Sequence, residues 1–201
     1  MLQASYSSQL AAGCDEVGRG CLAGPIVAAA VILPQDYTNL LLKDSKQLTA
    51  QQRLWLNALI REEALDWAIG CASVSEIDQL NVLKASHLAM HRAIAQLEIV
   101  PEVLLIDGQY FKAYPTIRHR CIVRGDQQHS AIAAASVLAK VYRDQYMQEL
   151  ALQVPGYSWE HNKGYPTLVH RKAIHNLGVT SHHRKGCQAV SRQLHFRLWS
   201  S

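Results

Sequence analysis

The stretch Cys14-Asp15-Glu16-Val17-Gly18-Arg19-Gly20 places two adjacent carboxylates directly before a glycine-flanked arginine. Apolar runs on either side, at residues 11–17 and 25–33, are typical of two strands joined by a short turn. Carboxylates at a strand end can bind a hard cation, and backbone amides freed by glycine can bind a phosphate. This combination indicates phosphodiester chemistry, and the rest of the chain is expected to supply what this stretch lacks.

The composition is that of a globular protein of one domain. The chain has 201 residues, of which 49% are hydrophobic, enough to bury a sizeable core. It has no apolar run of about 18 residues, and residues 1–10 show no signal-peptide pattern, so we expect no membrane association. Five scattered cysteines without a paired C-x-x-C motif favour a reducing, cytoplasmic location over a zinc ribbon or a disulfide scaffold.

The charge of the chain is divided unevenly along its length. Residues 1–117 carry 8 basic and 12 acidic side chains, whereas residues 118–201 carry 12 basic and 4 acidic ones. A basic second half facing an acidic first half fits a clamp for a polyanion around a metal site. A solvated basic surface explains the same numbers equally well, so charge alone does not decide between them.

Strands come first and then alternate with helices, which predicts a mixed sheet flanked by helices, with a helical tail. Thr49, with Gln52 three residues later, predicts a capping box at the start of a helix, and Ser75 and Asn81 are cap candidates for the next two helices. Further strands are expected at residues 67–74, 103–106 and 120–123, and further helices at 130–152, 167–177 and 191–199. The helix after Asn81 is expected to bury one face made of Leu83, Met90, Ile94 and Leu97.

Three segments share one design, in which an apolar strand ends in an acid beside glycine. They are Asp15-Glu16 before Gly18, Asp107-Gly108, and Gly125-Asp126. Such a cluster repels itself unless a cation such as Mg²⁺ or Mn²⁺ neutralises it. For a single Asp-Gly the turn interpretation is favoured, but three in one chain indicate a site. Because adjacent strand residues point to opposite faces, Asp15 and Glu16 can share a metal site only where the strand ends or twists, or where a backbone carbonyl helps.

Five motifs occur in an order that resembles the bacterial ribonuclease HII family, over about residues 11–192. The motifs are Asp15 to Gly20, Asp44 to Leu48, Asp107-Gly108, Gly125-Asp126 with Ile132 to Val141, and Lys163 to Thr167. The resemblance implies a ribonuclease H-like fold with a five-stranded mixed sheet and a C-terminal helical extension. It implies a catalytic domain at residues 1–154 and a substrate-binding extension at 155–201, within one compact unit.

The resemblance also implies an activity and a set of site residues. The expected activity is metal-dependent cleavage of RNA in RNA–DNA hybrids and on the 5′ side of single ribonucleotides in duplex DNA, giving 3′-hydroxyl and 5′-phosphate ends. The four catalytic and metal-binding acids fall on Asp15, Glu16, Asp107 and Asp126. The substrate contacts fall on Gly18, Arg19 and Gly20 at the ribose 2′-hydroxyl, Tyr165 at the RNA–DNA junction, and Lys46 and Arg184 at phosphates. Gln109 and Gly186-Cys187 depart from the family pattern.

Alternatives of other classes remain at this point. They are a non-catalytic hybrid-binding module of the same fold and a type 1 ribonuclease H. His87 and His91 are four residues apart, but a packing role is preferred over a metal site because no third ligand is indicated. Residues 193–196, Gln-Leu-His-Phe, resemble a sliding-clamp-binding peptide only weakly. We expect a monomer that uses one or two Mn²⁺ or Mg²⁺ ions and has no membrane partner.

Overall fold

The computed structural model describes residues 2–3, 9–43, 48–187 and 190. The chain forms two compact units. The first unit comprises Met1–Val17, Val27–Cys71 and His87–Val141, and the second comprises Gly18–Ile26, Ala72–Ser86 and Tyr142–Ser201. Each unit is therefore built from separated pieces of chain, and the functional division at residue 154 stays a prediction. No described helix has the length and hydrophobicity needed to cross a membrane.

A mixed five-stranded sheet forms the centre of the first unit, as predicted. Its strands lie in the order β3-β2-β1-β4-β5. β1 pairs antiparallel with β2 and parallel with β4, and β4 pairs parallel with β5. The strands are β1 (Ala11–Val17), β2 (Ile26–Ile32), β3 (Asp66–Ala72), β4 (Val103–Asp107) and β5 (Arg118–Ile122).

The helices confirm two of the three predicted caps, Thr49 and Asn81, whose Oδ1 accepts from the Lys84 N–H at 3.1 Å. Thr49 and Gln52 form the predicted capping box of α2. The cap of α3 is Ser73 rather than Ser75, because Glu76 lies three residues after Ser73 and completes a capping box there. The helices are α1 (Leu40–Lys43), α2 (Ala50–Glu63), α3 (Val74–Leu80), α4 (Val82–Ile94), α5 (Ser130–Gln153), α6 (Trp159–Asn162) and α7 (Leu168–Leu177), with a 3₁₀ turn η2 at Gly125–Gln127.

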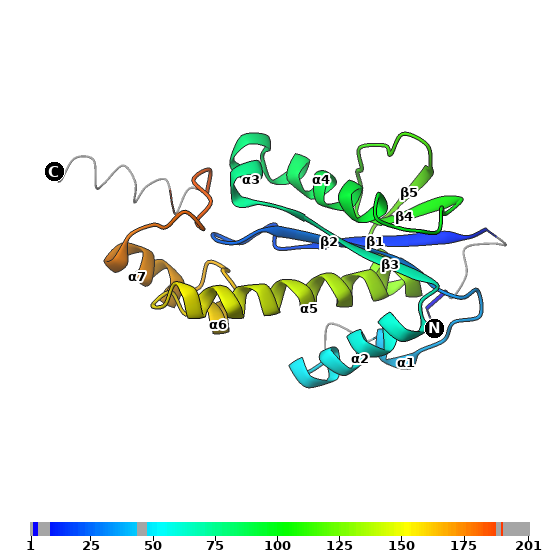
Figure 1. Ribbon diagram of the computed structural model, residues 1–201, viewed down its shortest axis with the longest axis horizontal. Helices are drawn as coiled ribbons and strands as arrows, with labels where there is room; N and C mark the ends of the chain where they lie inside the picture. Colours follow the sequence, from blue (N-terminus) through cyan, green and yellow to red (C-terminus); the bar gives the residue numbers. More distant parts are fainter. Residues whose placement is uncertain (1, 4–8, 44–47, 188–189, 191–201) are drawn as a thin grey trace. The chain divides into compact units, whose positions relative to one another are not determined.

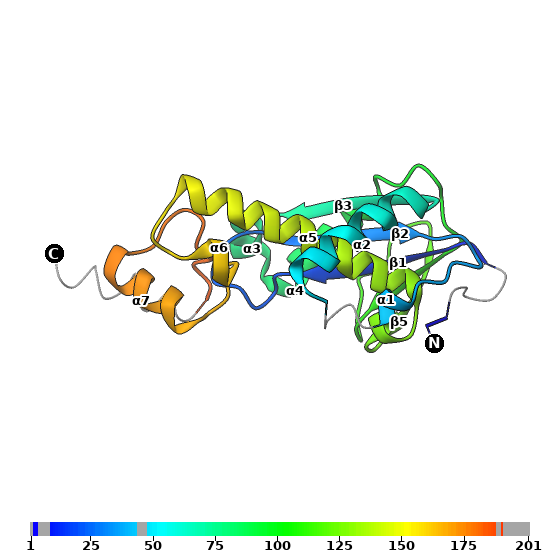
Figure 2. The same ribbon diagram turned by 90° about the horizontal axis from the view of Figure 1, so that it is seen from below.

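The core of the first unit lies between the sheet and the helices on its two faces. In Figure 1, α4 covers one face of the sheet, and α2 with the first half of α5 covers the other. Figure 2 shows α2 and α5 running across the strands. Alanines 133–135 of α5 pack against Val27 and Val31 of β2. A Cβ atom on Gly13 would lie 2.2 Å from the backbone carbon of Ala131, so this glycine permits the close approach of α5 to β1.

The predicted apolar face of α4 is only half right. Met90 and Ile94 are buried, but Leu83 is 42% exposed and Leu97 lies beyond the end of the helix. Alanines at 85, 89 and 93 are fully buried in their place. The predicted helix at residues 191–199 lies outside the described residues.

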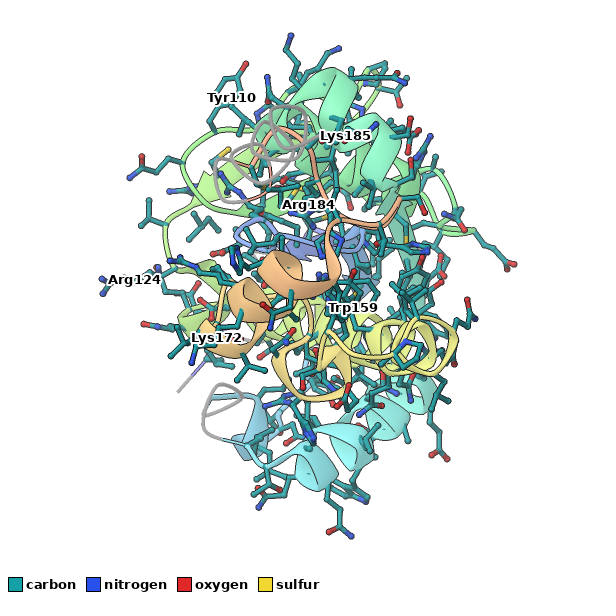
Figure 3. All side chains as sticks on the ribbon, turned by 90° about the vertical axis from the view of Figure 1, so that its left-hand side faces the viewer. Tyr110, Arg124, Trp159, Lys172, Arg184 and Lys185 are labelled. Carbon is teal, nitrogen blue, oxygen red and sulfur yellow. The ribbon has the colours of Figure 1, made fainter. Side chains whose placement is uncertain are left out.

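The second unit has its own core around Trp159. This residue is fully buried and stacks on Tyr157, with ring centroids 4.9 Å apart. Figure 3 shows Trp159 in the interior of this unit. Met147, Leu150 and Ile174 belong to the same cluster of buried side chains.

Candidate active site

The acids at the ends of β1 and β4 lie on neighbouring strands. Cys14 is opposite Ile106 in the parallel register, so Asp15 and Asp107 are the next residues along the two strands. Side chains at matched positions of paired strands point to the same face. That face is the one covered by α5, because the side chain of Ser136 on α5 forms a hydrogen bond with Asp15.

Asp15 carries a strongly perturbed carboxyl group. Burial, followed by the charges of Glu16 and Asp107, raises its pKa to about 8. The hydrogen bonds from Ser136 and from the Glu16 backbone act in the opposite direction, and the Glu16 N–H donates to Oδ1 of Asp15 at 2.7 Å. Three acids are thus close enough to repel one another. A carboxylate that is disfavoured by burial and by like charges is a typical mark of a functional site.

Asp126 is connected to Asp107 through the residue that precedes it. The N–H of Gly125 donates a hydrogen bond to Oδ1 of Asp107 at 2.7 Å. Asp126 follows within η2 and is 4% exposed. The third acid-bearing segment is therefore held directly against the second.

The acids suit a divalent cation that shares its ligands with a substrate. No three histidine, cysteine, aspartate or glutamate side chains among the described residues form a ready-made metal site. Mg²⁺ is commonly held by one or two carboxylates together with waters and substrate phosphates rather than by a cage of protein ligands. Asp15 and Asp107 fit this mode, because a cation between them would relieve the repulsion that raises the pKa of Asp15.

In the second unit, two buried arginines hold the loop that contains Gly18, Arg19 and Gly20. Arg143 donates from Nε to the Pro25 carbonyl at 2.9 Å and from Nη2 to the Ala23 carbonyl at 3.0 Å. Gly18 has φ +97°, and a Cβ atom there would lie 2.4 Å from Nε of Arg143. The arginine therefore needs a glycine at this position. Arg19 and Gly20 remain exposed.

Arg184 requires a correction. The sequence suggested a phosphate contact, but its side chain has no exposed surface. Its guanidinium donates to the carbonyls of Gly24 at 2.8 and 3.0 Å, Arg19 at 3.1 Å and Pro25 at 3.2 Å. Burial lowers its pKa to about 10. Because its donors face backbone carbonyls, Arg184 supports the loop from within instead of meeting a phosphate at the surface.

Tyr165 lies beside the same loop in the second unit. Leu22 N–H donates to the Gly164 carbonyl at 2.8 Å, and Nη1 of Arg143 donates to the Lys163 carbonyl at 2.8 Å. The Arg143 guanidinium lies 5.8 Å from the centre of the Tyr165 ring. Burial, followed by the neighbouring Cys21, raises the pKa of Tyr165. Hydrogen bonds therefore join the tyrosine segment to residues 22–23, directly after the loop at 18–20.

Several residues fall outside these two groups. Lys46, the predicted phosphate contact, lies outside the described residues. His87 and His91 have the predicted packing role, since their Nε2 atoms contact the carbonyls of Tyr110 at 3.3 Å and Lys112 at 2.8 Å. The sequence analysis assigned no role to Arg143 or Ser136. For Ser136 the one available signal was a polar side chain within the small, apolar run at residues 131–139, whereas Arg143 stands among other polar side chains and gave no such signal.

The fold and the acids together define a class of protein. A five-stranded mixed sheet flanked by helices is a ribonuclease H-like fold. The sequence model of one family within this class, described as Ribonuclease HII, matches residues 12–196. The chain belongs to the ribonuclease HII family.

Relatives and solved structures agree with this membership. The chain is 56% identical to a ribonuclease HII of Parabacteroides distasonis over 188 residues, 94% of each protein. It is 57% identical to that of Bacteroides thetaiotaomicron over 173 residues, 86% of each. The structure of ribonuclease H2 from Pyrococcus horikoshii covers 93% of this chain and 98% of its own, with a TM-score of 0.77 at 23% identity, and supports the fold.

Family membership decides between the alternatives of the sequence analysis. The protein is an enzyme, a nuclease, and neither a binding module nor a type 1 ribonuclease H. The family indicates ribonuclease H activity on RNA–DNA hybrids.

Proposed function

We propose that this enzyme hydrolyses the RNA strand of RNA–DNA hybrids and also cuts on the 5′ side of single ribonucleotides embedded in duplex DNA. Water attacks the phosphorus, the bond to the preceding 3′-oxygen breaks, and the products carry 3′-hydroxyl and 5′-phosphate ends. The observation that carries the proposal is the pair Asp15 and Asp107 on adjacent strand ends, where burial of Asp15 and repulsion from its acidic neighbours raise the pKa of Asp15 to about 8.

Asp15, Glu16, Asp107 and Asp126 are proposed to hold one or two divalent ions, Mn²⁺ or Mg²⁺. A manganese complex is known for a ribonuclease HIII whose fold is similar to this chain, with a TM-score of 0.72. When bound, such an ion supplies charge neutralisation at the phosphate and lowers the pKa of water. The protein side chains orient the scissile phosphate, and the Gly125 N–H fixes the rotamer of Asp107.

The second unit is proposed to read the sugar. Gly18, Arg19 and Gly20 contact the ribose 2′-hydroxyl, which is the group that distinguishes RNA from DNA. Gly18 follows Glu16 by two residues in the sequence. Tyr165 packs against the sugar at the RNA–DNA junction, and Lys46 contacts a phosphate. Residues 1–154 carry the chemistry, and residues 155–201 add substrate contacts.

The remaining expectations belong to this proposal. We infer a cytoplasmic location from the five scattered cysteines, and we propose a monomeric enzyme that acts on nucleic acid and has no membrane partner. A ribonuclease HII of Archaeoglobus fulgidus, 23% identical to this chain, is known in complex with PCNA, and the weak likeness of residues 193–196 to a clamp-binding peptide makes a sliding clamp the protein partner to test. A clamp pull-down that Phe196→Ala leaves unchanged would remove it.

One assay tests the central proposal. A labelled DNA duplex with a single ribonucleotide is incubated with the protein and Mg²⁺, Mn²⁺ or a chelator. We expect one cut on the 5′ side of the ribonucleotide, with either ion and not with chelator. Asp15→Asn and Asp107→Asn should lose most of the activity and still bind the hybrid, whereas Asp36→Asn, an exposed acid elsewhere, should behave as the unaltered protein. Full turnover by either active-site variant would overturn the assignment.

A further inference from the structure

The edge strand β5 of the first unit presents a row of arginines. β5 lies at one end of the strand order and is paired on one side only, with β4. Arg118 and Arg120 are exposed, whereas His119 between them is turned to the other face and packs against Phe111, with ring centroids 5.2 Å apart. Arg124 is exposed two residues after the strand ends. These three arginines are called the basic row.

The register places the basic row on the face of the sheet that carries the acids. Asp107 is opposite Ile122, Leu105 is opposite Arg120, and Val103 is opposite Arg118. Matched side chains of paired strands share a face, so Arg118 and Arg120 point to the same side as Asp107. At about 3.3 Å per residue, Arg120 lies about 7 Å and Arg118 about 13 Å along β5 from the level of Asp107.

The charge of Arg120 acts on His129, which is close to Asp126 along the chain. Burial lowers the pKa of His129, and the Arg120 charge lowers it further. His129 is three residues from Asp126 along the chain. The charge of Arg120 therefore acts on the residue that directly precedes α5.

Arg124 adopts a backbone conformation that side chains disfavour. Its φ of 55° and ψ of 44° lie in the left-handed region. Every residue with a Cβ atom is strained there, and glycine or asparagine is the usual occupant. In Figure 3 the Arg124 side chain projects outward from the first unit. It stands directly before Gly125, whose N–H holds Asp107, and two residues before Asp126. An arginine kept at a strained position beside catalytic acids points to a functional contact.

We propose that the basic row binds the sugar–phosphate backbone of the duplex next to the scissile phosphate, with Arg124 nearest to the cut. This inference rests on the proposed function and adds a binding surface to it. A guanidinium presents a planar fork that matches a phosphate, and all three residues are arginine. A row that runs along one strand suits a linear polyanion with regularly spaced charges. Such contacts position the substrate and carry no sequence preference.

The competing interpretation is that these charges only protect an edge strand. Charged side chains on an exposed edge discourage pairing with another chain. That role needs no ligand, and it would leave DNA binding unchanged when the arginines are replaced. Binding to nucleic acid, measured as a function of salt, therefore separates the two interpretations.

The first experiment measures the affinity for a plain DNA duplex, which the enzyme does not cut, over a series of salt concentrations. The variants are Arg118→Gln, Arg120→Gln and the two combined, with Lys84→Gln as an exposed control of equal charge. Each lost phosphate contact should lower the slope of log affinity against log salt by about 0.9. If the variants aggregate while their slope of log affinity against log salt stays unchanged, the arginines only protect the edge strand and the proposal is overturned.

The second experiment uses Arg124→Gly, which removes the charge and relieves the backbone strain together. We expect thermal stability to be equal or higher, the salt slope to fall by about 0.9, and KM for the ribonucleotide duplex to rise several-fold. Ser158→Gly is the matched control, because Ser158 has the same φ of 55° in the second unit. It should gain stability without a change in slope. An unchanged slope for Arg124→Gly would exclude the contact.

The proposed function and the role of the basic row can each be disproved without the other. If the unaltered protein does not cut the single-ribonucleotide duplex, the proposed function is wrong, while the slopes on plain DNA still report on the basic row. If it cuts and the slopes do not change, only the basic row is wrong.

Discussion

The N–H of Gly125 donates a hydrogen bond to Oδ1 of Asp107 at 2.7 Å, and this contact joins two of the three acid-bearing segments. The donor residue, Gly125, directly precedes Asp126, and the acceptor, Asp107, is the last residue of β4. The contact between these two segments therefore depends on a backbone atom of a residue that has no side chain. A Cβ atom on Gly125 would lie 2.5 Å from Cδ1 of Ile132 and 3.3 Å from Cβ of Ile122.

Gly125→Ala should therefore disturb the site without touching an acid. The added methyl group has to push away Ile132 or shift the backbone, which moves the N–H off Asp107. Misplacing a catalytic group by about 1 Å can cost on the order of 10²-fold in rate, so we expect a large loss of kcat. Gly186→Ala is the control, because a Cβ atom there meets only Asp78 Oδ1 at 3.9 Å. Adding Ile132→Val should restore part of the activity. Full activity of Gly125→Ala would show that this hydrogen bond is dispensable.

The raised pKa of Asp15 predicts how the metal-free protein responds to pH. The folded protein keeps the Asp15 proton up to about pH 8, whereas the unfolded chain loses it near the ordinary aspartate pKa of 3.8. This group therefore stabilises the fold fully below pH 4, and its contribution is lost as the pH rises to 8. Thermal unfolding in chelator should show the decline for the unaltered protein and a flatter profile for Asp15→Asn. Each kcal/mol is worth about 2–4 °C in a chain of this size. Identical profiles for the two proteins would contradict the shift.

The fold was predictable where the sequence shows local signals. β1 and β4 are apolar runs that end beside an acid and a glycine, β2 is a continuous apolar run, and the capping box at Thr49 can be recognised from its residue types. Ser75 was mistaken for a cap although Glu76 stands at the right distance from Ser73, so the signal existed and was misread. The buried face of α4 was misread because alanine, not leucine, provides the close packing.

The support of the site was not predictable, because its contacts join distant parts of the chain. The carbonyls of residues 19–25 are held by Arg143 and Arg184, which follow them by more than 100 residues. A buried arginine looks the same in sequence as an exposed one. The likeness of Arg184 to its basic neighbour Lys185, which is exposed, led to the wrong assignment as a phosphate contact.

Arg184 should behave as a structural support of the loop. Arg184→Gln removes donors from three carbonyls, and each buried group left unsatisfied costs about 1–3 kcal/mol. Arg184→Lys should not rescue it, because an ammonium cannot reproduce the guanidinium fork. We expect a lower Tm for both variants, with an unchanged salt slope of duplex binding. A normal Tm together with a reduced slope would restore the phosphate contact that the sequence suggested.

His183 should make the fold sensitive to acid. Trp159 Nε1–H donates to His170 Nε2 at 2.9 Å, and Thr180 N–H donates to His183 Nδ1 at 3.0 Å. His183 Nε2 lies 3.2 Å from His170 Nε2, so it is the protonated nitrogen of a neutral ring. Burial, followed by the nearby His170 and His182, lowers the pKa of His183 to about 4.

The unfolded chain therefore binds a proton that the folded protein rejects between pH 6.5 and 4. Stability is full above pH 6.5 and is lost as the pH falls through this window, by on the order of 1–3 kcal/mol. Urea midpoints measured across the window should fall for the unaltered protein and for His161→Gln, an exposed control. His183→Asn should be less stable at neutral pH and less dependent on acid. If the urea midpoint of His183→Asn falls with pH as steeply as that of the unaltered protein, another group causes the acid sensitivity.

Tyr165 provides the sharpest test of sugar recognition, because its backbone and its ring have separate partners. The carbonyl of Tyr165 accepts from His170 Nδ1 at 2.9 Å, so a change of side chain leaves the backbone in place. Tyr165→Ala should reduce kcat/KM at a single embedded ribonucleotide more than within a long RNA stretch, where other registers of cutting are open. Tyr165→Phe retains the ring beside Arg143 and should keep most of the selectivity, because stacking depends on the ring face. Equal losses on both substrates for Tyr165→Ala would refute the junction role. A loss for Tyr165→Phe as large as that for Tyr165→Ala would move the recognition from the ring to the hydroxyl.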